Sequence, residues 1–248
     1  MATFGMILGT VVATRSGCRG RVRNPLAQPL PQRSLPWAAR HLEKVDEVRA
    51  RSGAIDLLFV GDSITQNYEQ PTPADFRPLW EQFFAPHRAL NLGFNADGTQ
   101  HVLWRLEHGE ADNIAPANIV LLIGTNNTWH DQGSGPADVA EGIEAVVASL
   151  HQRMPAAKIL VLAILPSAVT PQKTARDEAI NQTVAAFFRS SRFVRTLDLK
   201  PLFLNRDGTL DTSLFYDASL DPELPLVHPG FEGQRRMAQA VAEALYPR

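Results

Sequence analysis

The sequence feature that most constrains the fold is an apolar run that leads into a glycine, an acid and a serine. Residues 55–60 read Ile-Asp-Leu-Leu-Phe-Val and continue into Gly61, Asp62 and Ser63. The run is too short for a globular helix and lies between two glycines, so it predicts a buried parallel strand with Ser63 at its carboxyl end. Ligands of open α/β sheets bind at that end. A helix beginning near Ser63 would direct free N–H groups at the hydroxyl, which makes Ser63 the first candidate nucleophile.

Further apolar segments repeat this pattern of a strand followed by a loop. Short aliphatic runs predict strands over 89–92, 119–123, 158–165 and 193–199. Amphipathic spacing predicts helices over 37–51, 99–108, 139–150, 180–188 and 231–246. Strands that alternate with helices predict an α/β fold, a three-layer α/β/α sandwich around a parallel sheet of about five strands.

Composition narrows the domain count and the classes of partner. A chain of 248 residues with 44% hydrophobic residues predicts one domain with a large core. The 24 lysines and arginines nearly balance the 26 acids, so we expect no nucleic-acid partner. The single cysteine, Cys18, excludes an intrachain disulfide and a cysteine-based zinc site. No dinucleotide turn or phosphate loop motif is present, which disfavours nicotinamide and nucleotide triphosphate chemistry.

The first 35 residues differ in character from the rest. Prolines 25, 29, 31 and 36 predict a weakly ordered lead-in over 1–35, followed by one domain over 36–248. Residues 1–13 are apolar, but no lysine or arginine precedes them, and the run is too short to span a bilayer. The sequence therefore favours a cytoplasmic location over export without deciding the compartment, and we expect no membrane span.

Three strand ends carry residues suited to acyl transfer. The carboxyl ends of parallel strands share one edge of the sheet, so Ser63, Gly93 and Asn126 are expected to lie close together. Acyl transfer needs a nucleophile, a base and donors directed at an oxyanion. The N–H groups of Ser63 and Gly93 and the side-chain amide of Asn126 would supply three donors. Gly93 suits this role because a residue without a Cβ lets the substrate approach its N–H.

For the base, His228 is the strongest candidate among the seven histidines. It precedes the last predicted helix, where a loop can return to the same edge of the sheet. Imidazole is the usual base that takes a serine proton. No Gly-x-Ser-x-Gly motif is present, which argues against the α/β-hydrolase fold.

Four blocks in this order resemble the SGNH hydrolases, also called GDSL esterases and lipases: Gly61-Asp62-Ser63-Ile64, Gly93, Gly124-Thr125-Asn126-Asn127 and His228. The segments Asn91-Leu92-Gly93 and 97–106 are most similar to the platelet-activating-factor acetylhydrolase catalytic-subunit type. The resemblance covers the chain from about Trp37 onward. It implies a flavodoxin-like sandwich and hydrolysis of small acyl esters without a metal or organic cofactor. It also implies Ser63 as nucleophile, His228 as base, and an oxyanion hole of Ser63, Gly93 and Asn126. The subgroup forms dimers, so a homodimer is one arrangement that the resemblance implies.

One departure from the family concerns the acid that orients the histidine. The family places an aspartate three residues before it, and here that position is Pro225. We predict that Asp217 takes this role, with residues 218–225 as an insertion between it and the His228 block. Asp221 and Glu223, inside the insertion, are alternatives, and so is a backbone carbonyl that orients His228 without any acid.

A second departure lies beside Gly93. Asn95-Ala96 replaces two glycines of the subgroup, so its side chains would narrow or polarise the cleft. Trp129 follows the Asn126 turn and offers a surface on which a sugar ring could stack. We therefore predict that Asn95 and Trp129 contact substrate.

Three hypotheses for function follow. The leading one is a serine esterase for short-chain esters, an acetylesterase or deacetylase acting on an O-acetylated carbohydrate or another small ester. The second is an O-acyltransferase that passes the acyl group from Ser63 to a sugar hydroxyl through the same acyl-enzyme. The third is a non-catalytic module that binds an ester or carbohydrate, in which the altered acid block has ended turnover.

Overall fold

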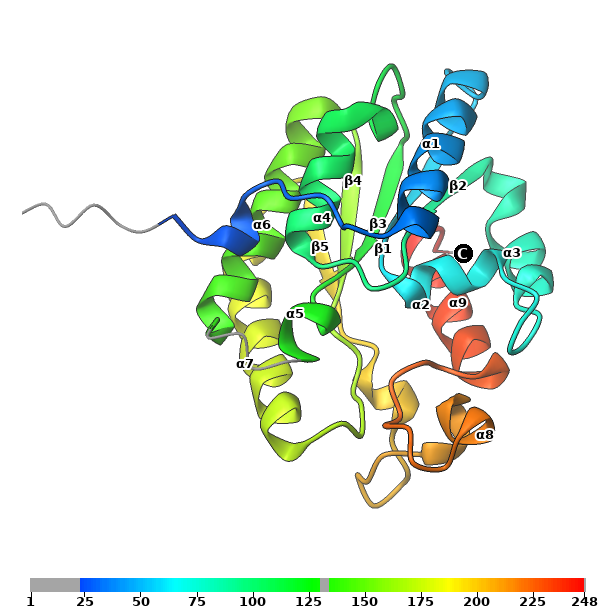
Figure 1. Ribbon diagram of the computed structural model, residues 1–248, viewed down its shortest axis with the longest axis vertical. Helices are drawn as coiled ribbons and strands as arrows, with labels where there is room; N and C mark the ends of the chain where they lie inside the picture. The colour runs from blue at the N-terminus through cyan, green and yellow to red at the C-terminus, as the bar shows by residue number, and fades with distance from the viewer. Residues whose placement is uncertain (1–22, 130–133, 248) are drawn as a thin grey trace, which may run out of the picture.

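A parallel sheet of five strands, in the order β2-β1-β3-β4-β5, forms the middle layer of the structure (Figure 1). The structure is a computed structural model and describes residues 23–129 and 134–247. The strands are β1 (Leu57–Gly61), β2 (Ala89–Gly93), β3 (Asn118–Leu122), β4 (Lys158–Leu162) and β5 (Val194–Leu197). Because β2 and β3 lie on opposite sides of β1, the chain changes direction across the sheet there. Ligands of such folds bind at this switch point, beyond the carboxyl ends of the strands.

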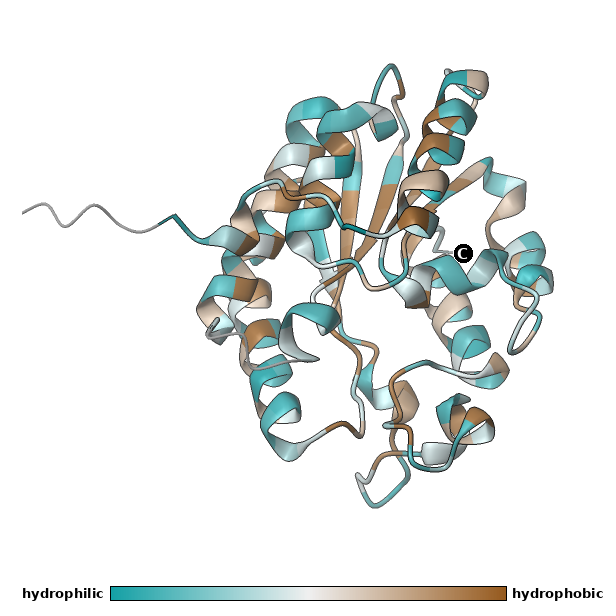
Figure 2. Ribbon diagram, viewed as in Figure 1, coloured by the Kyte–Doolittle hydropathy of each residue, from teal (hydrophilic) through white to brown (hydrophobic). Residues whose placement is uncertain are grey.

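Helices cover both faces of the sheet (Figure 1). Alternate residues of β1 enter different cores: Leu58 and Val60 belong to one cluster, and Leu57 and Phe59 to the other. The strands lie mostly in the hydrophobic colours of Figure 2, as expected for a sheet buried on both faces. The first cluster is covered by α1 (Leu35–Ala50), α4 (Thr99–Arg105), α6 (Pro136–Arg153) and α7 (Pro171–Phe188), and the second by α3 (Arg77–Phe83) and α9 (Phe231–Leu245). Three short helices, α2 (Ser63–Gln66), α5 (Thr125–Trp129) and α8 (Asp217–Leu220), complete the set that the site uses.

The predicted three-layer sandwich with five parallel strands is confirmed, and two strands are shorter than predicted. The strand predicted over 158–165 ends at Leu162, and the one predicted over 193–199 spans Val194–Leu197. Beyond Leu162, the side chain of Asn181 on α7 donates to the Ile164 carbonyl and accepts from the Ile164 N–H. This exchange replaces the strand ladder and ends β4.

Helix α7 begins at Pro171, well before the predicted start at residue 180. Thr170 caps the helix by accepting from the Lys173 N–H, and a proline follows in the first turn, where it is favoured. The early turns were missed because Lys173 and Asp177, which read as an exposed polar face, are buried and paired with each other. Helix α4 ends at Arg105 and continues as a π-helical turn (Leu106–Glu110), so the helix predicted over 99–108 changes type at its end.

The described part of the predicted lead-in packs against α4 and α6. Leu26 is buried, and its carbonyl accepts from the Thr99 hydroxyl. Asn24 donates to the Asp138 carbonyl at the start of α6. Residues 1–22, with Cys18 and the apolar stretch, lie outside the described residues, so the boundary at residue 36 and the compartment stay predictions. Between residues 23 and 247, outside the gap at 130–133, no helix is long and apolar enough to cross a bilayer.

Two glycines let α2 lie close against the ends of β1 and β2. Gly61 and Gly93 are partners in the sheet register. A Cβ on Gly61 would lie 2.2 Å from Thr65 Oγ1, and one on Gly93 would lie 2.3 Å from the Gln66 backbone nitrogen. These distances are too short for nonbonded atoms, so a larger residue at either position would push α2, which begins with Ser63, away from the sheet.

We expect Gly93→Ala to lower the free energy of unfolding by about 2 kcal/mol, because the added methyl overpacks the contact with α2. Gly135→Ala is the matched control: its Cβ would lie 3.7 Å from its nearest neighbour, Asp138 Oδ2. Urea unfolding of the two variants and the wild type makes the comparison. Equal stability of the two variants would contradict the close packing of α2.

Candidate active site

Ser63 is the first residue of α2 and directly follows β1. Asp62 caps the helix, since its Oδ1 accepts from the Ile64 N–H at 3.0 Å. Ser63 Oγ lies 3.0 Å from His228 Nε2. Within the described residues the Ser63 N–H has no acceptor, as is usual in the first turn of a helix. The hydroxyl therefore has a base in contact and a free N–H donor beside it.

Asp217 lies against the other ring nitrogen of His228. Its Oδ1 is 2.7 Å from His228 Nδ1, and its Oδ2 accepts from the backbone N–H groups of Val227 and His228 at 2.8 and 2.7 Å. Burial raises the pKa of Asp217, but the hydrogen bonds from His228 and from the two backbone N–H groups outweigh it and hold the pKa below its usual value. The carboxylate accepts a hydrogen bond from the Nδ1–H group of His228, which favours the ring tautomer whose Nε2 can accept from the serine hydroxyl.

The other acids of the insertion point away from this contact. Asp221 and Glu223 are exposed, and the Asp221 carboxylate accepts from the Glu223 N–H. The chain leaves at Asp217 and returns at Val227, and the two ends are joined by a bridge between Phe215 and Pro229. Of the candidates that the sequence left open, Asp217 is therefore the one that the structure brings to His228.

Gly93 does not take the place predicted for it. Its N–H is buried at the end of β2 and donates to Asn91 Oδ1 at 2.7 Å, so it is not available to an oxyanion. Ala96 lines the cleft beside Ser63 and His228, and no acceptor for its N–H lies within the described part of the chain. Ala96 has φ of 60°, a left-handed conformation that is uncommon for a residue with a Cβ. The Ala96 N–H is therefore a free donor beside the serine that the sequence analysis did not single out.

Asn126 lies in the first turn of α5, beyond the end of β3. Its Nδ2 donates to the Asp97 carbonyl at 2.8 Å, which orients the amide and leaves its second N–H free to donate. Behind Asn126, the buried Lys173 donates to the Thr125 hydroxyl at 3.0 Å, and Asp177 accepts from Thr128 at 2.7 Å. The first and last turns of α5 are thus both tied to α7.

Two lobes of a cleft meet at Ser63, His228, Asn95 and Ala96, which line both. The first, which we call the α1 lobe, has a volume of about 410 Å³, and the second, the α5 lobe, about 370 Å³. The α1 lobe is also lined by Gln32, Trp37, Gln66, Asn67, Gln70 and Tyr216, and the α5 lobe by Gln100, His101, Asn126 and Trp129. Asn95 and Trp129 therefore line the cleft, and their contact with substrate stays a prediction, whereas the glutamines and Tyr216 were not among the predicted residues. No group of three or more His, Cys, Asp or Glu side chains in residues 23–129 and 134–247 is arranged to hold a metal ion.

The carboxyl of Asp62 is buried behind the serine. Burial raises its pKa to about 7, against the lowering effect of the Ile64 N–H and the charge of His228, and its Oδ2 has no hydrogen-bond partner among the described residues. The ordinary value is 3.8, so the folded protein binds this proton more tightly than the unfolded chain. The free energy of unfolding contributed by Asp62 must then fall as the pH rises from about 4 to about 7.

Asp62→Asn keeps the cap acceptor and removes the charge. We expect the difference in free energy of unfolding between this variant and the wild type to shift in favour of the variant by more than ~1 kcal/mol from pH 5 to pH 8. Urea unfolding at both pH values measures this difference. Asp221→Asn controls for the loss of one negative charge at an exposed position. If the stability difference between Asp62→Asn and the wild type does not change with pH, Asp62 does not titrate in this window.

Comparison with known proteins places this geometry in a family. The model of the GDSL-like Lipase/Acylhydrolase family matches residues 59–236. The human platelet-activating factor acetylhydrolase IB subunit alpha1 is 33% identical over 199 residues, which cover 78% of this chain and 81% of that protein. A GDSL-like lipase from Bacteroides thetaiotaomicron superposes with a TM-score of 0.60 at 16% identity, covering 81% of this chain and 96% of that one. A carbohydrate acetylesterase from Sinorhizobium meliloti superposes with a TM-score of 0.57 at 16% identity, covering 77% and 98%. These two structures share the fold, and the family match together with the human relative shows that the chain belongs to the GDSL-like lipase/acylhydrolase family.

Proposed function

We propose that the protein is a serine esterase that hydrolyses short-chain acyl esters, acetyl esters above all, through an acyl-enzyme on Ser63. The observation that carries this proposal is the continuous relay from Ser63 Oγ to His228 Nε2, at 3.0 Å, and from His228 Nδ1 to Asp217 Oδ1, at 2.7 Å. A nucleophile in contact with a base that is itself oriented by an acid is the arrangement that activates serine.

The reaction proceeds in two steps of equal form. Ser63 Oγ attacks the ester carbonyl carbon while His228 Nε2 takes the serine proton, and the tetrahedral intermediate then expels the alcohol oxygen, which receives that proton. Water attacks the acyl-enzyme with the same base, and the acid leaves as Ser63 recovers its proton. Asp217 stays ionised throughout and stabilises the imidazolium that forms in each step.

The oxyanion would be bound by the N–H groups of Ser63 and Ala96 and by Asn126 Nδ2. Ala96 takes this role in place of Gly93, whose N–H already donates to Asn91. Each such donor contributes about 3 kcal/mol of transition-state stabilisation. Ala96 lines the cleft with Ser63 and His228, and its N–H has no acceptor among the described residues, as a donor to a bound atom requires.

The lining of the α1 lobe supports a polar alcohol in the ester. Neutral amides from Gln32, Gln66, Asn67 and Gln70, and the ring of Tyr216, surround the serine on this side. Amide side chains can both donate to and accept from sugar hydroxyls, and aromatic rings stack on sugar faces. Names of relatives point to acetyl esters, since one is a platelet-activating factor acetylhydrolase and another a carbohydrate acetylesterase. An O-acetylated saccharide, with Asn95 and Trp129 at the junction and in the α5 lobe, is the substrate class that we favour.

We expect the wild type to release acetate from p-nitrophenyl acetate and from an acetylated xylo-oligosaccharide, and Ser63→Ala to lose both activities, because the acyl-enzyme cannot form. Nitrophenolate absorbance and acetate assay measure the two reactions. Appearance of a newly acetylated saccharide in place of free acetate would assign the protein as an O-acyltransferase. Equal slow turnover by the wild type and Ser63→Ala, with no labelling of Ser63 by a fluorophosphonate, would leave the non-catalytic binding module.

Asp217→Asn is expected to lower kcat by about 10⁴, because the amide favours the wrong tautomer of His228 and does not stabilise the imidazolium. Asp221→Asn is the matched control four residues away, exposed and outside the relay, and should leave kcat within about twofold of the wild type. Steady-state kinetics on p-nitrophenyl acetate separate the two variants. A larger loss in Asp221→Asn than in Asp217→Asn would reassign the acid.

A further inference from the structure

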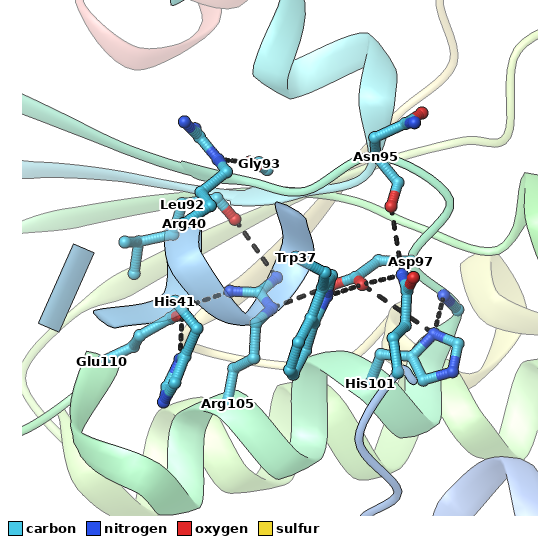
Figure 3. Close-up of polar contacts among 12 residues, drawn as sticks. Trp37, Arg40, His41, Leu92, Gly93, Asn95, Asp97, His101, Arg105 and Glu110 are labelled. Carbon is cyan, nitrogen blue, oxygen red and sulfur yellow. Dashed lines mark hydrogen bonds and ion pairs between the residues drawn. The ribbon is translucent and has the colours of Figure 1, made fainter. Parts of the chain in front are cut away.

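A row of buried charged side chains, Asp97, Arg105 and Glu110, extends from the turn over 94–97 into the interior (Figure 3). The guanidinium of Arg105 has no exposed surface and lies between the carboxylates of Asp97 and Glu110, which are equally buried. His41 on α1 lies at the far end of this row, with its Nδ1 2.8 Å from Glu110 Oε1. Burying such charges is costly, and apolar side chains of similar volume often stabilise a core as well or better. Stability alone therefore does not account for the group.

Asp97 is the member of this charged row whose backbone contacts a residue of the cleft, Asn126. Its Oδ2 accepts from Arg105 Nε at 2.8 Å, and its Oδ1 accepts from Trp37 Nε1 and Gln32 Nε2, each at 2.7 Å. Gln32 also donates to the Asn95 carbonyl at 3.0 Å. Three donors, from α1, from the segment before it and from α4, thus fix one carboxylate and the loop that bears it.

The backbone of Asp97 connects this carboxylate to two of the proposed oxyanion donors, the Ala96 N–H and the Asn126 amide. Its N–H closes the turn by donating to the Phe94 carbonyl at 3.2 Å, which sets the left-handed Ala96 between them. Its carbonyl accepts from Asn126 Nδ2 at 2.8 Å. The Phe94 ring lies 3.8 Å from the Arg105 guanidinium carbon, so the start of the same turn is held by the same cation.

We infer that Asp97 is a positioning residue for the oxyanion hole: the contacts of its buried carboxylate with Arg105, Trp37 and Gln32 fix the backbone that presents the Ala96 N–H and the Asn126 amide. The inference rests on the proposed function, because it assigns Ala96 and Asn126 as donors to an oxyanion. A left-handed alanine needs such a restraint, since a strained residue persists only where its surroundings hold it.

Asp97→Asn tests the inference. Both carboxylate oxygens accept hydrogen bonds, and the amide replaces one of them with an NH₂ donor. Either Arg105 or the pair Trp37 and Gln32 then loses its acceptor. We expect kcat on p-nitrophenyl acetate to fall about 10- to 100-fold while KM changes less than about 3-fold, as for a loss confined to the transition state. Labelling of Ser63 by a small alkyl fluorophosphonate should slow by a similar factor, because the phosphoryl oxygen occupies the oxyanion hole.

Glu110→Gln is the matched control. It disturbs the same Arg105 from the opposite side and is equally buried, but it does not touch the turn over 94–97. It should lower the thermal midpoint as Asp97→Asn does and leave kcat and the labelling rate within about 3-fold of the wild type. Equal losses of kcat in the two variants would show that the buried charges act through general stability, and would overturn the inference.

A second pair keeps the test decisive if Asp97→Asn does not fold. Trp37→Phe removes one donor to the Asp97 carboxylate, and Trp104→Phe alters the ring that packs beside Trp37 at 5.4 Å without touching Asp97. The first should lower kcat and the labelling rate, and the second should not. An active wild type matched in kcat by Asp97→Asn or Trp37→Phe overturns this inference alone, whereas a wild type that neither hydrolyses esters nor reacts with the fluorophosphonate overturns the proposed function and this inference with it.

Discussion

The close contact between α2 and the end of the sheet is the constraint on which the site depends. Gly61 and Gly93 are paired in register, and the absence of side chains there lets the first turn of α2 lie on the ends of β1 and β2. This contact places the Ser63 hydroxyl at the switch point of the sheet, with the N–H groups of the first helical turn beside it. It also forces the carboxyl of Asp62, the cap residue, into the interior, where burial raises its pKa to about 7. The position of the Ser63 hydroxyl and the cost of burying the Asp62 charge behind it have one geometric cause.

Buried polar groups hold the other loops that reach the serine. The turn over 94–97 is fixed by Asp97 and its donors, and α5 is fixed by Lys173, whose Nζ lies 2.6 Å from Asp177 Oδ2 and 3.0 Å from Thr125 Oγ1. Phe94 is a buried apolar anchor at the start of this turn, but Asn95, Asp97 and residues 125–128 are polar, so polar contacts set the direction of the backbone there. Hydrogen bonds to charged groups in a low-dielectric interior are strong and directional, and they set loop positions more narrowly than apolar contact does.

Sequence patterns predicted the fold and the residues at strand ends because both depend on local order in the chain. The apolar runs predicted the five strands, and Ser63 and Asn126 could be predicted because they lie within four residues of the ends of two of them. Gly93 was wrong as a donor because the absence of a Cβ says nothing about whether the N–H is already bonded, here to Asn91. The start of α7 was missed because Lys173 and Asp177 pair inside the protein, and a buried ion pair has the same sequence pattern as an exposed polar face. Three amides of the α1 lobe, those of Gln66, Asn67 and Gln70, come from one segment, but Gln32 comes from the segment before α1, and no periodicity connects the two.

Asp217 shows that spacing along the chain is a weaker guide to the residue that contacts a histidine than the hydrogen bonds which that residue makes. Its carboxylate accepts from the His228 ring and from two consecutive backbone N–H groups at 227 and 228. Three donors on the segment that returns from the loop therefore define its position. The loop between acid and base is closed outside these contacts by the Phe215 to Pro229 bridge and by the Tyr216 N–H, which donates to the His228 carbonyl. Lengthening a loop adds little to the entropic cost of closing it. The residues over 218–225 can therefore lie at the surface while Asp217 keeps its contact with His228, although the spacing between the two differs from that of the family.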